Sequence, residues 1–179
     1  HAHVGWLFHG HQRGLGRYTK DLREDPAIAA ANRHFLHWVI AGLILPAVLG
    51  GVLTLSWTGV GLGFLWGGLI RVLIIHHITW SVNSVCHLWG SRPFACGDES
   101  RNNPIVGLLA LGEGWHNNHH AFPTSARHGL RWWEIDFSYM LIRFMAMIGL
   151  AHKIRRPDRD RMTAKLRRRR HAPGREAPL

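Results

Sequence analysis

A long central stretch of the sequence lacks formal charge. No aspartate, glutamate, lysine or arginine occurs from residue 34 to residue 70. A soluble helix of such length normally carries a polar stripe, and FLHWVIAGLILPAVLGGVLTL carries none. This absence argues against a pair of buried helices in a soluble bundle, and it predicts segments that cross a bilayer.

Cysteine is also scarce, since Cys86 and Cys96 are the only two. Two cysteines do not make the disulfide framework that stabilises many small secreted domains. The sequence starts with His1 instead of methionine, and nothing near it resembles a signal peptide. We therefore expect a piece of a longer polypeptide whose thiols serve packing or lie in a reducing compartment.

Acidic residues are few, whereas basic residues, histidine and tryptophan are abundant. Lysine and arginine number 22 against 11 acidic residues, which gives a formal net charge of +11, and there are 15 histidines and 9 tryptophans. The basic residues concentrate near the end of the chain, where the sequence reads RRRR. We interpret this basic region either as a solvated tail or as a contact for anionic lipids. Beside a membrane domain, nucleic-acid binding is not expected.

The uncharged run is long enough for nearly two bilayer crossings, each of which needs about 20 apolar residues. Turn-forming residues in TLSWTGVG divide it and predict helices at about 35–55 and 60–80. The turn has no lysine or arginine, whereas both outer flanks do, so the positive-inside rule places both flanks in the cytoplasm. The predicted fold class is all-α and integral membrane, with a two-helix transmembrane hairpin and a cytoplasmic helical cap.

These features divide the chain into four regions. Pro26 predicts the start of a helix in the first, and residues 132–151 in the third are apolar but interrupted by charge, which favours an interfacial or core-packed helix. The regions are 1–33, a cytoplasmic segment; 34–80, the hairpin; 81–152, the cap with the candidate ligands; and 153–179, a disordered basic tail.

The densest group of potential metal ligands is GEGWHNNHH at residues 112–120. His116, His119 and His120 have the spacing i, i+3, i+4, which places their side chains on one helical face within a single turn. Imidazole nitrogen suits iron, copper, zinc and nickel. The cluster therefore predicts a transition-metal site.

A second helical stripe precedes this cluster. Asn83 and His87 lie four residues apart, and His76 and Thr79 fall on the same stripe. Two stripes on the cytoplasmic side could supply ligands to one site. The isolated histidines are interpreted as ordinary polar residues; these are His9, His11, His34, His37, His128, His152 and His171.

Zinc is an alternative occupant, because Cys86, His87, Cys96 and His116 could in principle supply four ligands. Structural zinc sites usually take their ligands from short-spaced pairs. The adjacent residues Cys86 and His87 would point in different directions on a helix. Zinc is therefore the weaker prediction.

Three motifs resemble one known family. GEGWHNNHHAFP resembles the third histidine box of the membrane fatty acyl-CoA desaturases of the delta-9 type, and TWSVNSVCHLWGSRPF resembles the segment before that box. HVGWL, near the start, resembles the segment that follows the family's second histidine box. The resemblance covers nearly the whole chain except the tail, and it implies that the hairpin is the last pair of four membrane helices.

The resemblance implies an oxygen-dependent oxidoreductase that inserts a cis double bond, expected at the delta-9 position, into a saturated fatty acyl chain. Such enzymes use two irons held by histidines. The residues that match the iron ligands are His87, His116, His119 and His120, together with Asn83, which reaches iron through a water.

The substrate and the partners are implied less fully. Thr79 and Trp80 match residues that line the acyl tunnel, and Arg13 and Arg17 follow HVGWL where acyl-CoA enzymes of the family carry basic residues. The acyl carrier stays open between coenzyme A, acyl carrier protein and membrane glycerolipid. Electrons are expected from a separate ferredoxin, cytochrome b5 or flavoprotein, because no donor domain is fused to these residues.

The sequence departs from the family at the first two histidine boxes, HxxxxH and HxxHH. Both should precede HVGWL, and neither does here. We therefore expect this polypeptide alone to hold a partial site and not to desaturate. Two alternatives stay open: a hydroxylase or other oxygenase with the same histidine boxes, and a non-catalytic membrane protein that binds metal.

Overall fold

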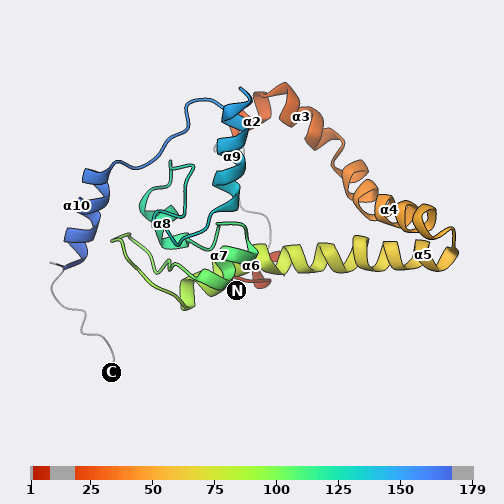
Figure 1. Cartoon of the computed structure of the whole chain (residues 1–179), viewed down its shortest axis with the longest axis horizontal. Coiled ribbons are helices and arrows are strands. Elements are labelled where there is room, and N and C mark those ends of the chain that lie inside the picture. The colour runs from red at the N-terminus through yellow and green to blue at the C-terminus, as the bar shows by residue number, and fades with distance from the viewer. Residues whose placement is uncertain (1, 9–18, 171–179) are drawn as a thin grey trace. The chain divides into compact units, whose positions relative to one another are not determined.

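The computed structural model describes residues 2–8 and 19–170. Over these residues the fold is helical, as predicted, and contains no β-strand; the backbone pairings outside helices include isolated bridges from Asn102 to Ser91 and Trp115. Figure 1 shows the helices in chain order. They are η1 Gly5–Phe8, α2 Lys20–Glu24, α3 Pro26–Arg33, α4 Phe35–Thr54, α5 Trp57–Leu62, η2 Gly63–Ile70, α6 Arg71–Leu88, α7 Pro104–Leu109, α8 His116–Ala121, α9 Phe137–Met147 and α10 Arg159–Arg170.

The chain forms two units. The hairpin unit is Val4–His77, and the histidine unit consists of His1–His3 with Ile78–Leu179. Helix α6 contributes residues to both units. The four regions predicted from the sequence were divided by charge, hydropathy and motifs and not by compactness, and that division stays a prediction.

Two helices of the structure are long and apolar enough to cross a membrane by length and composition, Phe35–Thr54 and Trp57–Leu88. The second is continuous through α5, the π-helical segment η2 and α6. Most residues of α4 are exposed, and Ala47 is its only buried residue. Uniformly apolar, exposed helices of this length are expected where lipid takes the place of water. Helix α4 contacts α5 and η2, and Figure 1 shows α4 meeting the long helix at its α5 end.

The two helices approach each other through glycine. A Cβ atom on Gly50 would overlap the carbonyl oxygen of Gly59, and one on Gly63 would overlap that of Pro46. A Cβ atom on Gly59 would overlap both Thr54 and Gly50. Small residues at four-residue spacing let helix backbones pack closely where no hydrophobic effect drives them together. Glycine therefore brings the backbones of the two helices into close contact.

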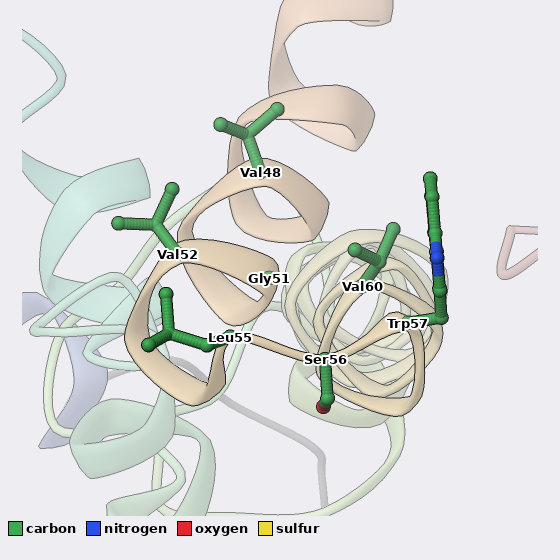
Figure 2. Close-up of a pocket in the computed structure, with 7 residues that line it drawn as sticks. All are labelled: Val48, Gly51, Val52, Leu55, Ser56, Trp57 and Val60. Carbon is green, nitrogen blue, oxygen red and sulfur yellow. The ribbon is translucent and has the colours of Figure 1, made fainter.

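The turn of the hairpin follows Thr54. Leu55 adopts the left-handed conformation (φ 49°) and ends α4, and the Ser56 hydroxyl accepts a hydrogen bond from the backbone N–H of Gly59 (3.0 Å) to start α5. A shallow apolar pocket lies at this turn (Figure 2), and none of its residues is a metal-binding type. Its lining consists of Val48, Gly51, Val52, Leu55, Ser56, Trp57 and Val60.

Arg71 is the first charged residue after the uncharged run. Its guanidinium donates to the carbonyl oxygen of Gly67 (2.6 Å) on its own helix and to that of Gly42 (2.8 Å) on α4. A charge among apolar helices is tolerated when backbone carbonyls accept its hydrogen bonds. Arg71 therefore links the two helices of the hairpin.

Side-chain caps set the shorter helices. Asp25 accepts from the N–H groups of Ala27 (2.8 Å) and Ile28 (3.2 Å), so α3 begins at Pro26 as predicted. The apolar segment predicted at 132–151 is helical only over α9, because Asp136 caps that helix by accepting from the N–H of Tyr139.

Part of the segment expected to be a disordered tail is helical. Helix α10 contacts the rest of the histidine unit through Met162, which packs on a cluster formed by Phe94, Ala121 and Phe122. Lys165 donates to the carbonyl oxygen of Ala121 and lies over the ring of Phe122. Residues 171–179 lie outside the described part of the chain.

Candidate metal centre

Helix α8 carries the histidine cluster and is a single short helix, HNNHHA. The histidines face one way and the two asparagines between them face the interior, where Asn117 is 0% and Asn118 1% exposed. A helix this short is marginal by itself. Its position therefore depends on the hydrogen bonds that these asparagines make.

Asn117 fixes α8 to the loop that follows α6. Its side chain accepts from the N–H of Phe94 (2.9 Å) and donates to the carbonyl oxygen of Phe94 (3.2 Å), and it also contacts the sulfur of Cys96 (3.1 Å). This paired contact with one backbone residue resembles a step of a β-ladder. It prevents α8 from rotating about its axis.

Asn118 fixes the opposite side of the same turn. Its Nδ2 donates to Oε2 of Glu134 (2.8 Å), and its Oδ1 accepts from Nδ2 of Asn102 (2.8 Å). Asn102 in turn accepts from the backbone N–H of Asn118 (3.1 Å). Glu134, 4% exposed, also accepts from the N–H groups of Leu130 and Arg131. A buried carboxylate is tolerated when several donors satisfy it.

The GEG sequence before α8 is explained by close backbone approach. Gly112 has φ 121°, a conformation that favours glycine, and a Cβ there would overlap the carboxylate of Asp136. A Cβ on Gly114 would overlap the backbone of Gly107 in α7. The two glycines thus let the chain pass between α7 and α9 immediately before the first histidine.

Three histidines from two helices come together. His87 of α6 and His116 and His120 of α8 offer nitrogen atoms that all lie within 4.8 Å of one another. The Nε2 atoms of His87 and His116 are 3.1 Å apart. Two nitrogen ligands, each about 2.0–2.1 Å from one ion, lie roughly 3 Å apart when they are at right angles. The donor set and the spacing therefore fit a transition-metal ion.

His119 lies outside this triad of His87, His116 and His120. Its ring packs against that of His128, with centroids 4.6 Å apart. Among the described residues, its Nδ1 is buried and makes no hydrogen bond. A buried polar atom without a partner calls for an explanation, and a second metal ligand position is a chemically suitable one. His128, interpreted from the sequence as an ordinary polar residue, therefore belongs to the surroundings of a candidate ligand.

Burial disfavours the charged form of two of these histidines. Burial, together with the neighbouring rings of His120, His87 and His119, lowers the pKa of His116 to about 3. Burial and the nearby rings of His128 and His120 also lower the pKa of His119. Neutral imidazole is the form that binds a metal, so both shifts favour the form that could act as a ligand.

Asp98, which the sequence motifs did not single out, contacts the triad. Its Oδ2 lies 2.5 Å from Nδ1 of His120. Burial raises the pKa of Asp98, but hydrogen bonds from Ser100 and His120 outweigh burial and bring the pKa below its usual range. The carboxylate is therefore ionised and acts only as an acceptor.

The four-ligand zinc set is not assembled. Cys86 is buried and its thiol is directed to the carbonyl oxygen of Gly114 (3.8 Å), while Cys96 contacts Ser100 and Asn117. Within the described residues, the cluster that could hold an ion contains histidine alone.

The remaining predicted residues are distributed as follows. Asn83 lies one turn before His87 on α6 and is exposed, and Thr79 is exposed on the same helix. Trp80 is half-buried and meets the ring of His3 edge to face, with centroids 5.9 Å apart. The roles of these three residues stay predictions, and Arg13 and Arg17 lie outside the described residues.

His3 was matched only as part of HVGWL, and its contact with α6 was not foreseen. Its Nδ1 is hydrogen bonded to the hydroxyl of Ser84 (2.8 Å), which also donates to the carbonyl oxygen of Trp80 (3.0 Å). The start of the chain thus meets the helix that carries His87.

Comparisons with known proteins show which family the chain matches. The fatty acid desaturase family model matches residues 1–156. The chain is 40% identical over 165 residues to a hex-5-enoyl-[acyl-carrier protein] acetylenase from Moorena producens (92% of this chain, 51% of the relative). It is 41% identical over 160 residues to an sn-1 stearoyl-lipid 9-desaturase from Anabaena variabilis (88% and 56%). It is also 41% identical over 161 residues to an icosanoyl-CoA 5-desaturase from Limnanthes douglasii (87% and 43%).

The chain spans about half the length of these curated relatives. The family match nevertheless covers most of the 179 residues, including every candidate ligand. The chain belongs to the fatty acid desaturase family.

Proposed function

We propose that these residues hold the third histidine box of a membrane-bound di-iron desaturase, which inserts a cis double bond into a saturated fatty acyl chain. The observation that carries the proposal is the convergence of His87, His116 and His120. Beside them, the buried Nδ1 of His119 has no hydrogen-bond partner among the described residues. Family membership supports the same reaction class.

We assign the triad to one iron and His119 to the second. Asn83, on the same face of α6 as His87, is proposed to contribute through a water. When bound, the two irons supply the oxygen chemistry that breaks unactivated C–H bonds. The protein contributes neutral imidazoles held in a fixed arrangement, because the asparagines between them are buried and fully hydrogen bonded.

The proposed substrate is a saturated acyl chain lying along α6, with Thr79 and Trp80 at the walls of its tunnel. One position along a uniform chain can be selected only if the chain is held rigidly and water is excluded. We propose the delta-9 position, as in the name of the Anabaena relative. The names of the relatives include an acyl-carrier protein, a lipid and a coenzyme A substrate, so the carrier that would meet Arg13 and Arg17 is left open.

We further propose that the two apolar helices cross the membrane as a hairpin, with the cap and both ends of the chain in the cytoplasm. The 20-residue and 32-residue apolar helices support this arrangement, as does the distribution of basic residues. Anionic lipids would contact the basic helix α10, and electrons would come from a separate ferredoxin, cytochrome b5 or flavoprotein.

The 179 residues supply four candidate histidine ligands, His87, His116, His119 and His120. Two irons need more ligands than four imidazoles and a water-bridged asparagine supply. We therefore expect these residues alone to bind metal incompletely and not to desaturate.

Expression of the intact gene in a host that lacks endogenous desaturase, followed by mass spectrometry of the host's fatty acids, tests the proposal. We expect a new cis-monoene that disappears in a His116→Ala variant. A hydroxylated acyl chain would instead identify a hydroxylase. Unchanged fatty acids together with bound iron would identify a non-catalytic metal-binding protein, and would contradict the proposal.

A further inference from the structure

Asp98 reaches the candidate metal centre from a part of the sequence that no histidine motif includes. It lies in the loop between α6 and α7, 22 positions before His120. Its Oδ2 is hydrogen bonded to Nδ1 of His120 at 2.5 Å.

The loop holds this carboxylate in place through contacts of its own. Oδ1 of Asp98 accepts from the backbone N–H of Ser100 (2.9 Å), a residue that is fully buried. Arg92 donates both to the carbonyl oxygen of Asp98 and to the side chain of Glu99 (2.6 Å). One carboxylate oxygen is thus used to fix the loop, and the other is left for His120.

The direction of this hydrogen bond determines which ring nitrogen of His120 can bind a metal. In the hydrogen bond that this contact describes, the ring nitrogen Nδ1 of His120 donates and the carboxylate oxygen accepts, which places the proton on Nδ1. In neutral imidazole, Nε2 then carries the free lone pair. His120 is a member of the triad with His87 and His116, and its Nε2 is the nitrogen that Asp98 leaves available.

We propose that Asp98 is a positioning residue that fixes the tautomer and ring orientation of His120, so that Nε2 is presented to the metal. The proposal rests on the proposed function of the triad and deepens it by adding a residue that contacts a ligand and not the metal. Partners of this kind typically change metal affinity 10–100-fold when they are removed.

The test is a titration of the intact metal-free protein in detergent with Co²⁺, in competition with a chelator and followed by the visible absorption of bound Co²⁺. For Asp98→Asn we expect about 10–100-fold weaker affinity and shifted absorption bands. Asp98→Glu, which keeps a carboxylate one methylene farther out, should give an intermediate affinity. The matched control is Asp160→Asn, which removes the same charge from an exposed residue of α10 and should behave as the unaltered protein.

A double-mutant cycle separates positioning from a general effect on the fold. In a His120→Ala background, Asp98→Asn should weaken Co²⁺ binding no further, because the residue through which Asp98 acts is gone. An equal loss in both backgrounds would overturn the proposal. So would Asp98→Asn and Asp98→Glu variants that match the Asp160→Asn control in affinity and spectrum; if the Asn variant does not fold, the Glu variant decides.

His116→Ala distinguishes failure of this inference from failure of the proposed function. If His116→Ala abolishes Co²⁺ binding and the Asp98 variants do not alter it, only the role of Asp98 is refuted. If the unaltered protein binds no Co²⁺, or if His116→Ala binds it equally well, the metal centre itself is refuted and the role of Asp98 with it.

Discussion

In the hairpin unit, helices meet through glycine and their side chains face outward. In the histidine unit, buried polar side chains hold short helices and loops in place. Gly50, Gly59 and Gly63 bring two backbones close together, whereas Asn117 and Asn118 are buried inside their unit. The packing of the hairpin thus depends on glycines that have no side chain. The packing of the histidine unit depends on specific hydrogen-bond donors and acceptors. A metal centre needs the second kind of packing, because ligands must be held in direction as well as in position.

The largest effect on activity is expected from removing a candidate metal ligand that the buried polar side chains hold in place. In the intact protein, His119→Ala should abolish desaturation and reduce bound iron, since a methyl group cannot replace an imidazole. Because His119 lies outside the triad, iron should fall toward one ion per chain and not to zero. Elemental analysis and fatty acid analysis measure the two results.

The matched control for that variant is His152→Ala, which removes an exposed histidine. It should retain both iron and activity. Full turnover by the His119→Ala variant would show that His119 is not a ligand.

A direct test of the polar packing is Asn118→Leu. This change fills the same space but leaves Glu134 and Asn102 buried without one of their partners. Each unsatisfied buried group costs about 1–3 kcal/mol, so we expect the free energy of unfolding of the histidine unit to fall by about 2–5 kcal/mol. Thermal unfolding in detergent measures it.

Asn32→Leu provides the comparison for that experiment, because Asn32 is exposed on α3. It should change stability by less than about 0.5 kcal/mol. Equal destabilisation by the two leucine variants would mean that the network around Asn118 contributes nothing specific.

The glycine packing of the hairpin is tested by Gly59→Val. The new side chain would overlap Thr54 and the backbone of Gly50, and overpacking of this kind typically costs about 1–3 kcal/mol. Gly61→Val is the matched control, because a Cβ at Gly61 meets nothing within 4 Å. The midpoint temperature of thermal unfolding should fall for Gly59→Val and not for Gly61→Val. Equal midpoints for the two variants would rule out close packing at Gly59.

The smallest effect concerns Trp80, on the helix that contributes to both units. Trp80→Ala should leave bound iron unchanged, because Trp80 contacts His3 and is not in the triad. It should raise KM for the acyl substrate by about tenfold or shift the double bond, as loss of about 1–2 kcal/mol of apolar and ring contact implies.

Kinetics and product analysis of that variant check both outcomes, with Trp132→Ala as the control at an exposed tryptophan. Loss of iron along with altered products would place Trp80 at the metal and not at the substrate.

The two long apolar helices and the clustering of histidines on α8 could be predicted from sequence because each has a local signature. The absence of charge marks α4, and the i, i+3, i+4 spacing marks the face of α8 that carries the candidate ligands. Asp98 and Glu134 could not be found in this way, because each is a single carboxylate whose partner on α8 lies 16 or more positions away. The two asparagines within HNNHH were an available signal, since polar residues on the inner side of a helix require buried partners.

Helix α10 and the place of His128 were missed for a related reason. The basic composition of residues 153–170 predicts a solvated tail. The contacts that Met162 and Lys165 make with the cluster around Phe122 depend on tertiary structure, so they could not be predicted from composition. His128 belongs to no periodic pattern, so nothing in the sequence distinguishes it from the other isolated histidines.

The hydrogen bonds of Asn118 have an evolutionary consequence. Asn102, Asn118 and Glu134 satisfy one another inside the histidine unit, so a substitution at one of them is tolerated only with a change at another. Among family members, these three positions should covary as a group while the histidines stay fixed. Genes that keep the histidines but lose this covariation would then be candidates for chains that have drifted away from the ancestral reaction.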